Sequence, residues 1–248
     1  MNNPPVTLSL ETATPGGSIF LARGADRLAS RKGNPHVSHS NIILTDINQC
    51  LNSARLKLAD VDLFSCASGP GSFTGLRIGI ATLKALAATL QRPCVGVPTL
   101  SAIAHSVGVS NAIVALLPAG RGEVFAQMFS VSLDEVVELD TAGHLSPQRL
   151  IERYRGISDL VWAGPGAHLH RGLLQDYAEQ NAIKFVEQMA QSTIERKSWA
   201  LAPQETNLAQ NVCALALRQF AVGQLQDAGS LQAIYVRPSD AEMNQLCQ

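Results

Sequence analysis

The chain has 248 residues, of which 46 % are hydrophobic and 16 % charged, and its formal net charge is −1. This length accommodates one large or two modest domains with a real hydrophobic core. The near-neutral charge, without a block of Lys or Arg, argues against a protein that binds nucleic acid without a partner protein, because neutralising phosphates requires clustered cations. A subunit of a larger RNA-modifying assembly remains compatible with it.

The sequence indicates neither a secretory signal nor a membrane span. Its first residues, MNNPPVTLSLETA, lack a basic region followed by an apolar run, and no run of 18 apolar residues occurs. The five cysteines are scattered and form no CxxC pair, which is typical of free thiols in a reducing compartment. We therefore expect a cytoplasmic protein without membrane contact.

The first half of the chain predicts a hairpin followed by alternating helices and strands. Strands are expected at Val6–Leu10, Ser18–Arg23 and near Asp26–Ser30, with a turn over Glu11–Gly17. The next elements, in order, are a helix capped by Ser38 or Ser40, a strand over Asp62–Ala67, a long helix, a strand over Pro93–Val97 and a helix over Pro98–Ser106. This order indicates a mixed α/β sheet with an antiparallel edge.

A glycine-rich loop, Ser68–Ser72, joins the strand over Asp62–Ala67 to the long helix. Such a loop exposes N–H groups at the positive end of a helix dipole and is a candidate phosphate or nucleotide site. The residues that would form the site are Glu11, Gly69, Gly71, Ser72, Gly75 and Arg77. The competing interpretation, which we favour, is that the glycines let the helix approach the sheet.

The long helix is apolar on two sides. One side carries Leu76, Gly79, Leu83, Leu86 and Leu90, the opposite side carries Ile78, Ala81, Ala85 and Ala88, and a polar stripe between them carries Arg77, Lys84 and Gln91. We expect the leucine side to pack on the sheet. The small-residue side then contacts either a partner or another helix of this chain.

The second half repeats the order of the first. A hairpin is expected over Ala112–Pro118 and Glu123–Val131. It is followed by a third strand over Asp134–Glu138, a helix over Ser146–Tyr154, a strand over Leu160–Ala163, a glycine-rich turn at Gly164–Gly166, a long helix over Gln204–Leu225 and a strand in the tail Leu231–Glu242. We expect one lobe at 1–108 with the helix at 204–225, a second lobe at 109–203, and a C-terminal strand and tail at 226–248.

No metal site is predicted. His36 and His39 stand three residues apart, and no Cys, Asp or Glu follows before Asp46 to complete a ligand set. The absence of an HExxH pattern also disfavours a metallopeptidase.

The string GPGSFTGLRIG, Gly69–Gly79, resembles the signature of the bacterial TsaB (YeaZ) family. Supporting segments keep the family order: Leu8–Thr14, His39-Ser40, Val95–Ser101, Arg121–Phe125 and Tyr235–Pro238. The resemblance runs from about residue 6 to 242, and 180–203 is the least covered stretch.

The resemblance implies an α/β fold of the ASKHA type (actin, sugar kinase, Hsp70-like), with two ribonuclease-H-like lobes. It also implies a non-catalytic scaffold for threonylcarbamoyl transfer to adenosine 37 of ANN-decoding tRNA. The implied partners are a TsaD-type catalytic subunit, a TsaE-type P-loop ATPase and, through the complex, tRNA; alone, the chain is a candidate homodimer. No cofactor is required, although weak nucleotide binding at the complex interface is compatible with the family.

The family's dimer surface uses two helices of the first lobe, which here correspond to Ser40–Leu56 and Thr74–Leu90. The residues expected at the partner interface are Ile43, Ile47, Ile78, Ala81, Ala85 and Ala88.

Two hairpin positions depart from the usual pattern. ASKHA phosphotransferases place an Asp in each hairpin turn, whereas this chain has Glu11 in the first and Pro118 in the second. Proline ligates no Mg²⁺, so in-line phosphoryl transfer loses part of its metal clamp. The alternative function, an ATP-dependent small-molecule kinase or ATPase using Glu11, Gly69–Gly75 and Gly164–Gly166, is therefore disfavoured.

Overall fold

The computed structural model describes residues 3–36, 39–187 and 197–236. The chain forms two compact units. Unit 1 comprises Met1–Ala102 and Thr206–Ile234, and unit 2 comprises Ile103–Glu205 and Tyr235–Gln248. The boundary falls within helix α3 (Thr99–Val107). Residues 226–234, expected in a separate tail, belong to unit 1.

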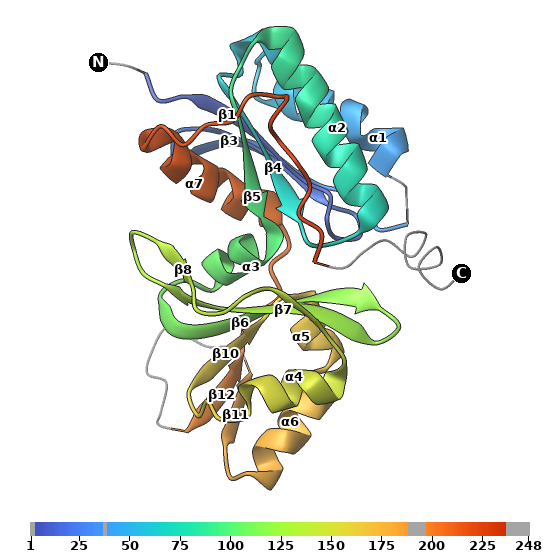
Figure 1. Cartoon of the computed structure of the whole chain (residues 1–248). Coiled ribbons are helices and arrows are strands. Elements are labelled where there is room, and N and C mark those ends of the chain that lie inside the picture. Colours follow the sequence, from blue (N-terminus) through green and yellow to red (C-terminus); the bar gives the residue numbers. More distant parts are fainter. Residues whose placement is uncertain (1–2, 37–38, 188–196, 237–248) are drawn as a thin grey trace. The chain divides into compact units, whose positions relative to one another are not determined.

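Unit 1 is built on a mixed sheet (Figure 1). Its elements are β1 (Val6–Glu11), β2 (Ser18–Arg23), β3 (Asp26–Lys32), α1 (His39–Ser53), the 3-10 turn η1 (Leu58–Asp60), β4 (Leu63–Gly69), α2 (Phe73–Leu90), β5 (Cys94–Pro98), the start of α3 and α7 (Leu208–Ala221). In the described residues the strand order is β3-β2-β1-β4-β5, with β1 antiparallel to β2 and parallel to β4.

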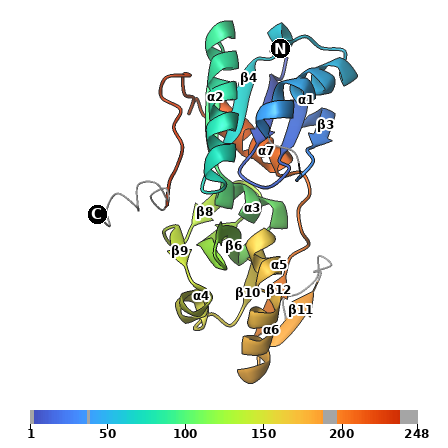
Figure 2. The ribbon, with the colours of Figure 1, turned by 90° about the vertical axis from the view of Figure 1, so that its right-hand side faces the viewer.

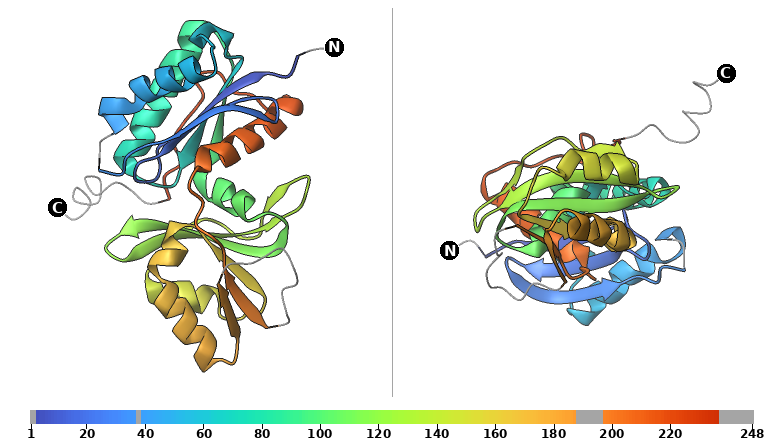
Figure 3. Two further views of the ribbon diagram at one scale, coloured as in Figure 1. Left: turned by 180° about the vertical axis from the view of Figure 1, so that it is seen from behind. Right: turned by 90° about the horizontal axis from the view of Figure 1, so that it is seen from below.

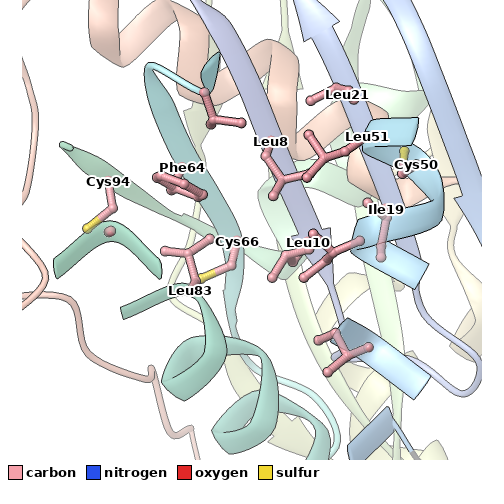
Figure 4. Packing of buried hydrophobic residues seen from close by; sticks show 14 of the residues in the cluster. Leu8, Leu10, Ile19, Leu21, Cys50, Leu51, Phe64, Cys66, Leu83 and Cys94 are labelled. Carbon is pink, nitrogen blue, oxygen red and sulfur yellow. The ribbon is translucent and has the colours of Figure 1, made fainter. Parts of the chain in front are cut away.

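The sheet of unit 1 is covered on both faces. Figure 3 shows α1 and α2 on one face and α7 on the other. Alternate residues of β1 face the two sides of the sheet. Leu8 and Leu10 enter the core beneath α1 and α2, where Figure 4 shows them beside Leu51 and Ile19. On the opposite face, Ser9 lies beside Cys213 of α7. Because both faces are covered, every residue of β1 is buried.

Unit 2 contains a second mixed sheet. Its elements after α3 are β6 (Ser110–Gly120), β7 (Glu123–Val131), β8 (Val136–Glu138), β9 (Gly143–Leu145), α4 (Pro147–Tyr154), β10 (Leu160–Ala163), α5 (Pro165–Leu169), α6 (Arg171–Gln180), β11 (Lys184–Glu187) and β12 (Ser198–Leu201). In the described residues the order is β11-β12-β10-β6-β7-β8, with β9 paired to β7. The core centres on Trp162, whose ring meets those of Trp199 and Tyr154 at centroid distances of 5.0 and 5.9 Å.

The strand orders of the two units correspond. In each, the first strand is central, the second and third extend from one side of it, and later parallel strands extend from the other side. In each, a Gly-Pro-Gly turn lies at the end of the parallel strand that is paired with the first strand, at Gly69–Gly71 for β4 and at Gly164–Gly166 for β10. The predicted repeat of two related halves is confirmed.

Several boundaries differ from the prediction. The helix expected over Gln204–Leu225 is the shorter α7, and the turn at Gly164–Gly166 already begins α5. The tail strand is wrong within the described residues, since 231–236 form no strand. Leu231 there is buried in the core instead, and the backbone N–H of Ile234 donates to the carbonyl of Ser68. The rest of the expected tail, with Ser38 and residues 188–196, lies outside the described residues.

Candidate functional site

The glycine-rich loop uses its backbone N–H groups within unit 1. The N–H of Gly69 donates to Oγ1 of Thr99 at 3.2 Å, and the N–H of Ser72 donates to the carbonyl of Ala13 at 2.8 Å. Ser72 caps α2, because its hydroxyl accepts from the N–H of Gly75 at 3.2 Å. These three N–H groups are therefore already engaged and do not point to a bound anion.

The glycines of this segment face the turn between β1 and β2. A Cβ on Gly71 would lie 2.6 Å from the Cβ of Ala13. A Cβ on Gly75 would overlap the carbonyl of Thr12, and one on Gly79 would overlap the hydroxyl of the same threonine. This geometry supports the interpretation that the glycines allow close packing of α2 on the hairpin.

Glu11 lies at the end of β1 and is 2 % exposed. Its two carboxylate oxygens accept from the N–H and the hydroxyl of Thr14, each at 2.8 Å. Burial raises the pKa of Glu11 from 4.5 to about 7, against the opposing effect of the bonds from Thr14. The carboxylate therefore already fastens the hairpin turn.

A small hollow, partly open to solvent, lies beside Glu11 and is lined partly by Thr12, Arg31 and Asp46. The guanidinium of Arg31 and the carboxylate of Asp46 form an ion pair at 3.0 Å. Among the described residues, no three His, Cys, Asp or Glu side chains gather in a way that would hold a metal ion. The guanidinium of Arg77 lies 3.7 Å from the ring centroid of Phe73, on the exposed part of α2.

Helix α2 buries its large side chains and exposes its small ones. Leu76, Gly79 and Leu83 are buried, as the helical period predicts. Ala81, Ala85 and Ala88 are exposed. The small-residue face is thus not covered by a helix of unit 1. Ile78, at its edge, is half-buried against the core.

The helix also has the length and composition of a membrane span, with 33 % of its residues buried. Its leucine side is accounted for by the core of unit 1. The exposed residues of α2 are the alanine stripe together with Thr74, Arg77 and Thr89.

Two of the predicted interface residues lie on α1 and are buried in the core. Ile43 and Ile47 are 6 % and 3 % exposed and pack in the core of unit 1, so they form no exposed contact surface. The apolar period of α1 marks the side that faces the sheet. Leu44, which the periodicity passed over, is 64 % exposed and is the apolar side chain that α1 presents to solvent.

The second hairpin carries no carboxylate matching Glu11. Pro118 occupies an exposed position near the end of β6. The nearest acidic residue of the hairpin, Glu123, forms a pair with His144 at 2.8 Å. The glycine turn of unit 2 serves close packing, since a Cβ on Gly166 would lie 2.9 Å from Leu116.

Comparison with known proteins identifies the family. The profile described as "TsaD: tRNA N6-adenosine threonylcarbamoyltransferase" matches residues 35–228, which is most of the chain. The chain belongs to this family. It is similar to the TsaB protein of Escherichia coli, with 29 % identity over 164 residues, covering 64 % of this chain and 71 % of that protein. The TsaB protein of Haemophilus influenzae is 32 % identical over 141 residues, covering 54 % of this chain and 56 % of that protein.

The match to a tRNA N6-adenosine threonylcarbamoyltransferase of Protochlamydia amoebophila is shorter. It has 38 % identity over 73 residues, covering 29 % of this chain and 21 % of that protein. Among solved structures, YeaZ from Pseudomonas aeruginosa superposes with a TM-score of 0.71 at 23 % identity, covering 93 % of this chain and 99 % of that one. The resemblance to TsaB (YeaZ) and the ASKHA-type α/β fold predicted from the sequence are both confirmed.

Proposed function

We propose that this chain acts in forming threonylcarbamoyladenosine at position 37 of tRNA, as the non-catalytic partner of a TsaD-type catalytic subunit. Its family and the TsaB proteins it resembles support the pathway. The observation that carries the partner role is the exposed face of Ala81, Ala85 and Ala88 on a helix whose other side is fixed in the core. Small side chains allow close approach of a second helix.

The charge around this face favours a partner of opposite sign. Helix α2 contains no Asp or Glu, and its exposed surface includes Arg77; Arg92, after the end of the helix, pairs with Asp62 at 3.8 Å. We therefore propose that the alanine face docks against an apolar surface with an acidic rim on the TsaD-type subunit. Leu44 of α1 is added to the proposed interface because it is exposed.

The remaining partners follow from the same proposal. A TsaE-type ATPase joins the pair, tRNA is bound through the complex, and the protein works in the cytoplasm where tRNA is modified. Under this proposal the chain requires no cofactor, and weak nucleotide binding is assigned to the complex interface. In the absence of its partner, the same alanine face supports a homodimer.

Reconstitution tests the proposal. The chain is mixed with the TsaD-type and TsaE-type proteins of its own organism, threonylcarbamoyl-AMP, ATP and tRNA, and modified adenosine is measured with and without it. We expect modification to depend on this chain. Equal modification in its absence contradicts the proposal.

The kinase or ATPase alternative has less support. The carboxylate of Glu11 is bonded to Thr14, and the second hairpin offers Pro118 where a second carboxylate is needed. Steady ATP turnover by the isolated chain, lost in Glu11→Gln, would favour this alternative.

A further inference from the structure

The segment Gln226–Ile234, here called the strap, follows α7 and returns across unit 1. The backbone of Gln226 exchanges two hydrogen bonds with that of Cys94 in β5, each at 2.9 Å. The side-chain Oε1 of Gln226 accepts from the N–H of Gly96 at 3.0 Å. Figures 1 and 2 both show the strap running alongside α2.

Lys84 fastens the strap to the middle of α2. Its Nζ donates to the carbonyl of Leu231 at 3.0 Å and to that of Gly229 at 3.3 Å. The side chain of Leu231 is 1 % exposed and belongs to the same core as Leu83. One turn of α2 is therefore held to the strap by the charged hydrogen-bond donor Lys84 and by the packing of Leu231 in the core.

The far end of the strap reaches the loop that begins α2. The N–H of Ile234 donates to the carbonyl of Ser68 at 2.7 Å. A Cβ on Gly69 would overlap the carbonyl of Ile234, so the two backbones are in direct contact. The strap thus touches α2 at its centre and the loop at its start.

We propose that the strap, fastened by Lys84, is a positioning element that sets the alignment of the α2 face for its partner. This inference rests on the proposed function and deepens it. A contact formed by alanines depends on close backbone approach, so a small shift of α2 separates many atoms at once. Release of the strap therefore weakens the complex, although no strap residue is assigned to the interface.

The experiment uses full-length variants and the purified TsaD-type subunit of the same organism as the probe. Lys84→Met keeps the apolar stem and removes the two hydrogen bonds. Lys84→Arg restores a charged donor. Lys57→Met is the control, because Lys57 is an exposed cation of unit 1 distant in sequence from the strap. Gly96→Ala crowds the strap from the side of β5, since its Cβ would lie 2.7 Å from the Cδ1 of Leu231 and 3.2 Å from the Cβ of Ser68. Lys84→Met, which alters neither contact, is therefore the variant that isolates the effect of the strap on residues 69–76.

Two readouts are taken. In the isolated chain, we expect Lys84→Met and Gly96→Ala to speed amide hydrogen exchange at residues 69–76 as well as in the strap. With the partner, we expect both to dissociate about tenfold faster, because α2 is no longer held in the alignment that the partner contacts, while Lys57→Met matches the unaltered chain. Recovery by Lys84→Arg identifies the charged donor as the cause.

The inference is overturned if exchange at 69–76 is unchanged while strap exchange rises, or if dissociation rates stay within twofold of the unaltered chain. Ala85→Glu separates this failure from that of the proposed function. If Ala85→Glu abolishes binding but Lys84→Met leaves dissociation unaltered, the strap inference alone is wrong. If Ala85→Glu has no effect on binding, the α2 face is not the docking surface, and both the proposed interface and the strap's role in it are wrong.

Discussion

The carboxylate of Glu11 and residue Thr14 are joined by two hydrogen bonds of 2.8 Å, one from the backbone N–H and one from the hydroxyl. The pair closes the turn between β1 and β2 on which the glycines of α2 pack. Because the carboxyl group is buried, its pKa is raised to about 7. The side chain that phosphotransferases of this fold place at a metal site serves here to hold a turn.

Glu11 is expected to make stability depend on pH. Between the unfolded pKa of 4.5 and the folded value of about 7, the folded state holds a proton that the unfolded state has lost. The stabilisation that this proton gives to the folded state is fully present below pH 4.5 and is lost as the pH rises through about 7. Over this range the free energy of unfolding falls by about 3 kcal/mol. Glu11→Gln removes this slope, and urea unfolding of both proteins from pH 4.5 to 8 measures it.

Thr14→Val is the companion variant for Glu11. It removes the hydroxyl bond that opposes the effect of burial, so the carboxyl pKa rises further and the slope extends to higher pH. Parallel pH profiles for the unaltered chain and Glu11→Gln would contradict a raised pKa.

Ala85→Glu and Ala87→Glu differ by two positions and are expected to act oppositely. Ala85 is exposed on α2, so the glutamate leaves the chain folded and abolishes binding of the TsaD-type subunit. Ala87 is 1 % exposed, so the same change buries a carboxylate and destabilises unit 1 by several kcal/mol, about 3 or more. Circular dichroism reports folding and surface plasmon resonance reports binding. Unfolding by Ala85→Glu would show that its face is part of the core.

Gly75→Ala is expected to lower the free energy of unfolding by about 1–3 kcal/mol, because the new Cβ overlaps the carbonyl of Thr12 and forces α2 away from the hairpin. Gly172→Ala in α6 is the control. No atom lies within 4 Å of its added Cβ, so we expect a change of at most about 1 kcal/mol, in the stabilising direction. Thermal unfolding compares the two, and equal effects would contradict the close packing of α2.

The carboxylate of Asp140 is expected to stabilise unit 2 through three interactions. Its carboxylate accepts from the N–H of Met128 at 2.7 Å and from the hydroxyl of Tyr154 at 2.9 Å, and it pairs with Arg153 at 2.8 Å. Asp140→Ala leaves a buried tyrosine hydroxyl without this acceptor, so we expect a loss of about 2–3 kcal/mol.

Tyr154→Phe removes the other partner of that bond and should cost less, about 1 kcal/mol. Chemical unfolding of the two single variants and the double variant gives the coupling energy. Strict additivity would show that the Asp140–Tyr154 bond contributes nothing measurable.

The sequence predicted most of the hairpins and parallel strands because each carries its own local signal. The apolar strands of the first half are bounded by glycine and proline turns, and the GPGSFTGLRIG string is specific enough to identify the family. The two apolar sides of α2 were also assigned correctly, since Leu83 is buried and Ala85 is exposed.

The interface residues of α1 were misplaced for a physical reason. A helical period finds the apolar side of a helix, and in a folded unit that side is the core, as Ile43 and Ile47 show. The role of Lys84 was not predicted either. It is one of two charged residues in an otherwise uncharged helix, which is a signal in itself, but its acceptors lie 145 and 147 residues away in the strap.

The return of α7 and the strap to unit 1 sets an order of events on the ribosome. The main segment of unit 2, Ile103–Glu205, is synthesised before the residues that complete unit 1. Until Leu231 emerges, the core beneath α2 lacks one of its buried side chains, and the opposite face of the sheet awaits α7. Unit 1 is therefore begun before the main segment of unit 2 and completed after it, and helix α2 reaches its final packing only near the end of translation.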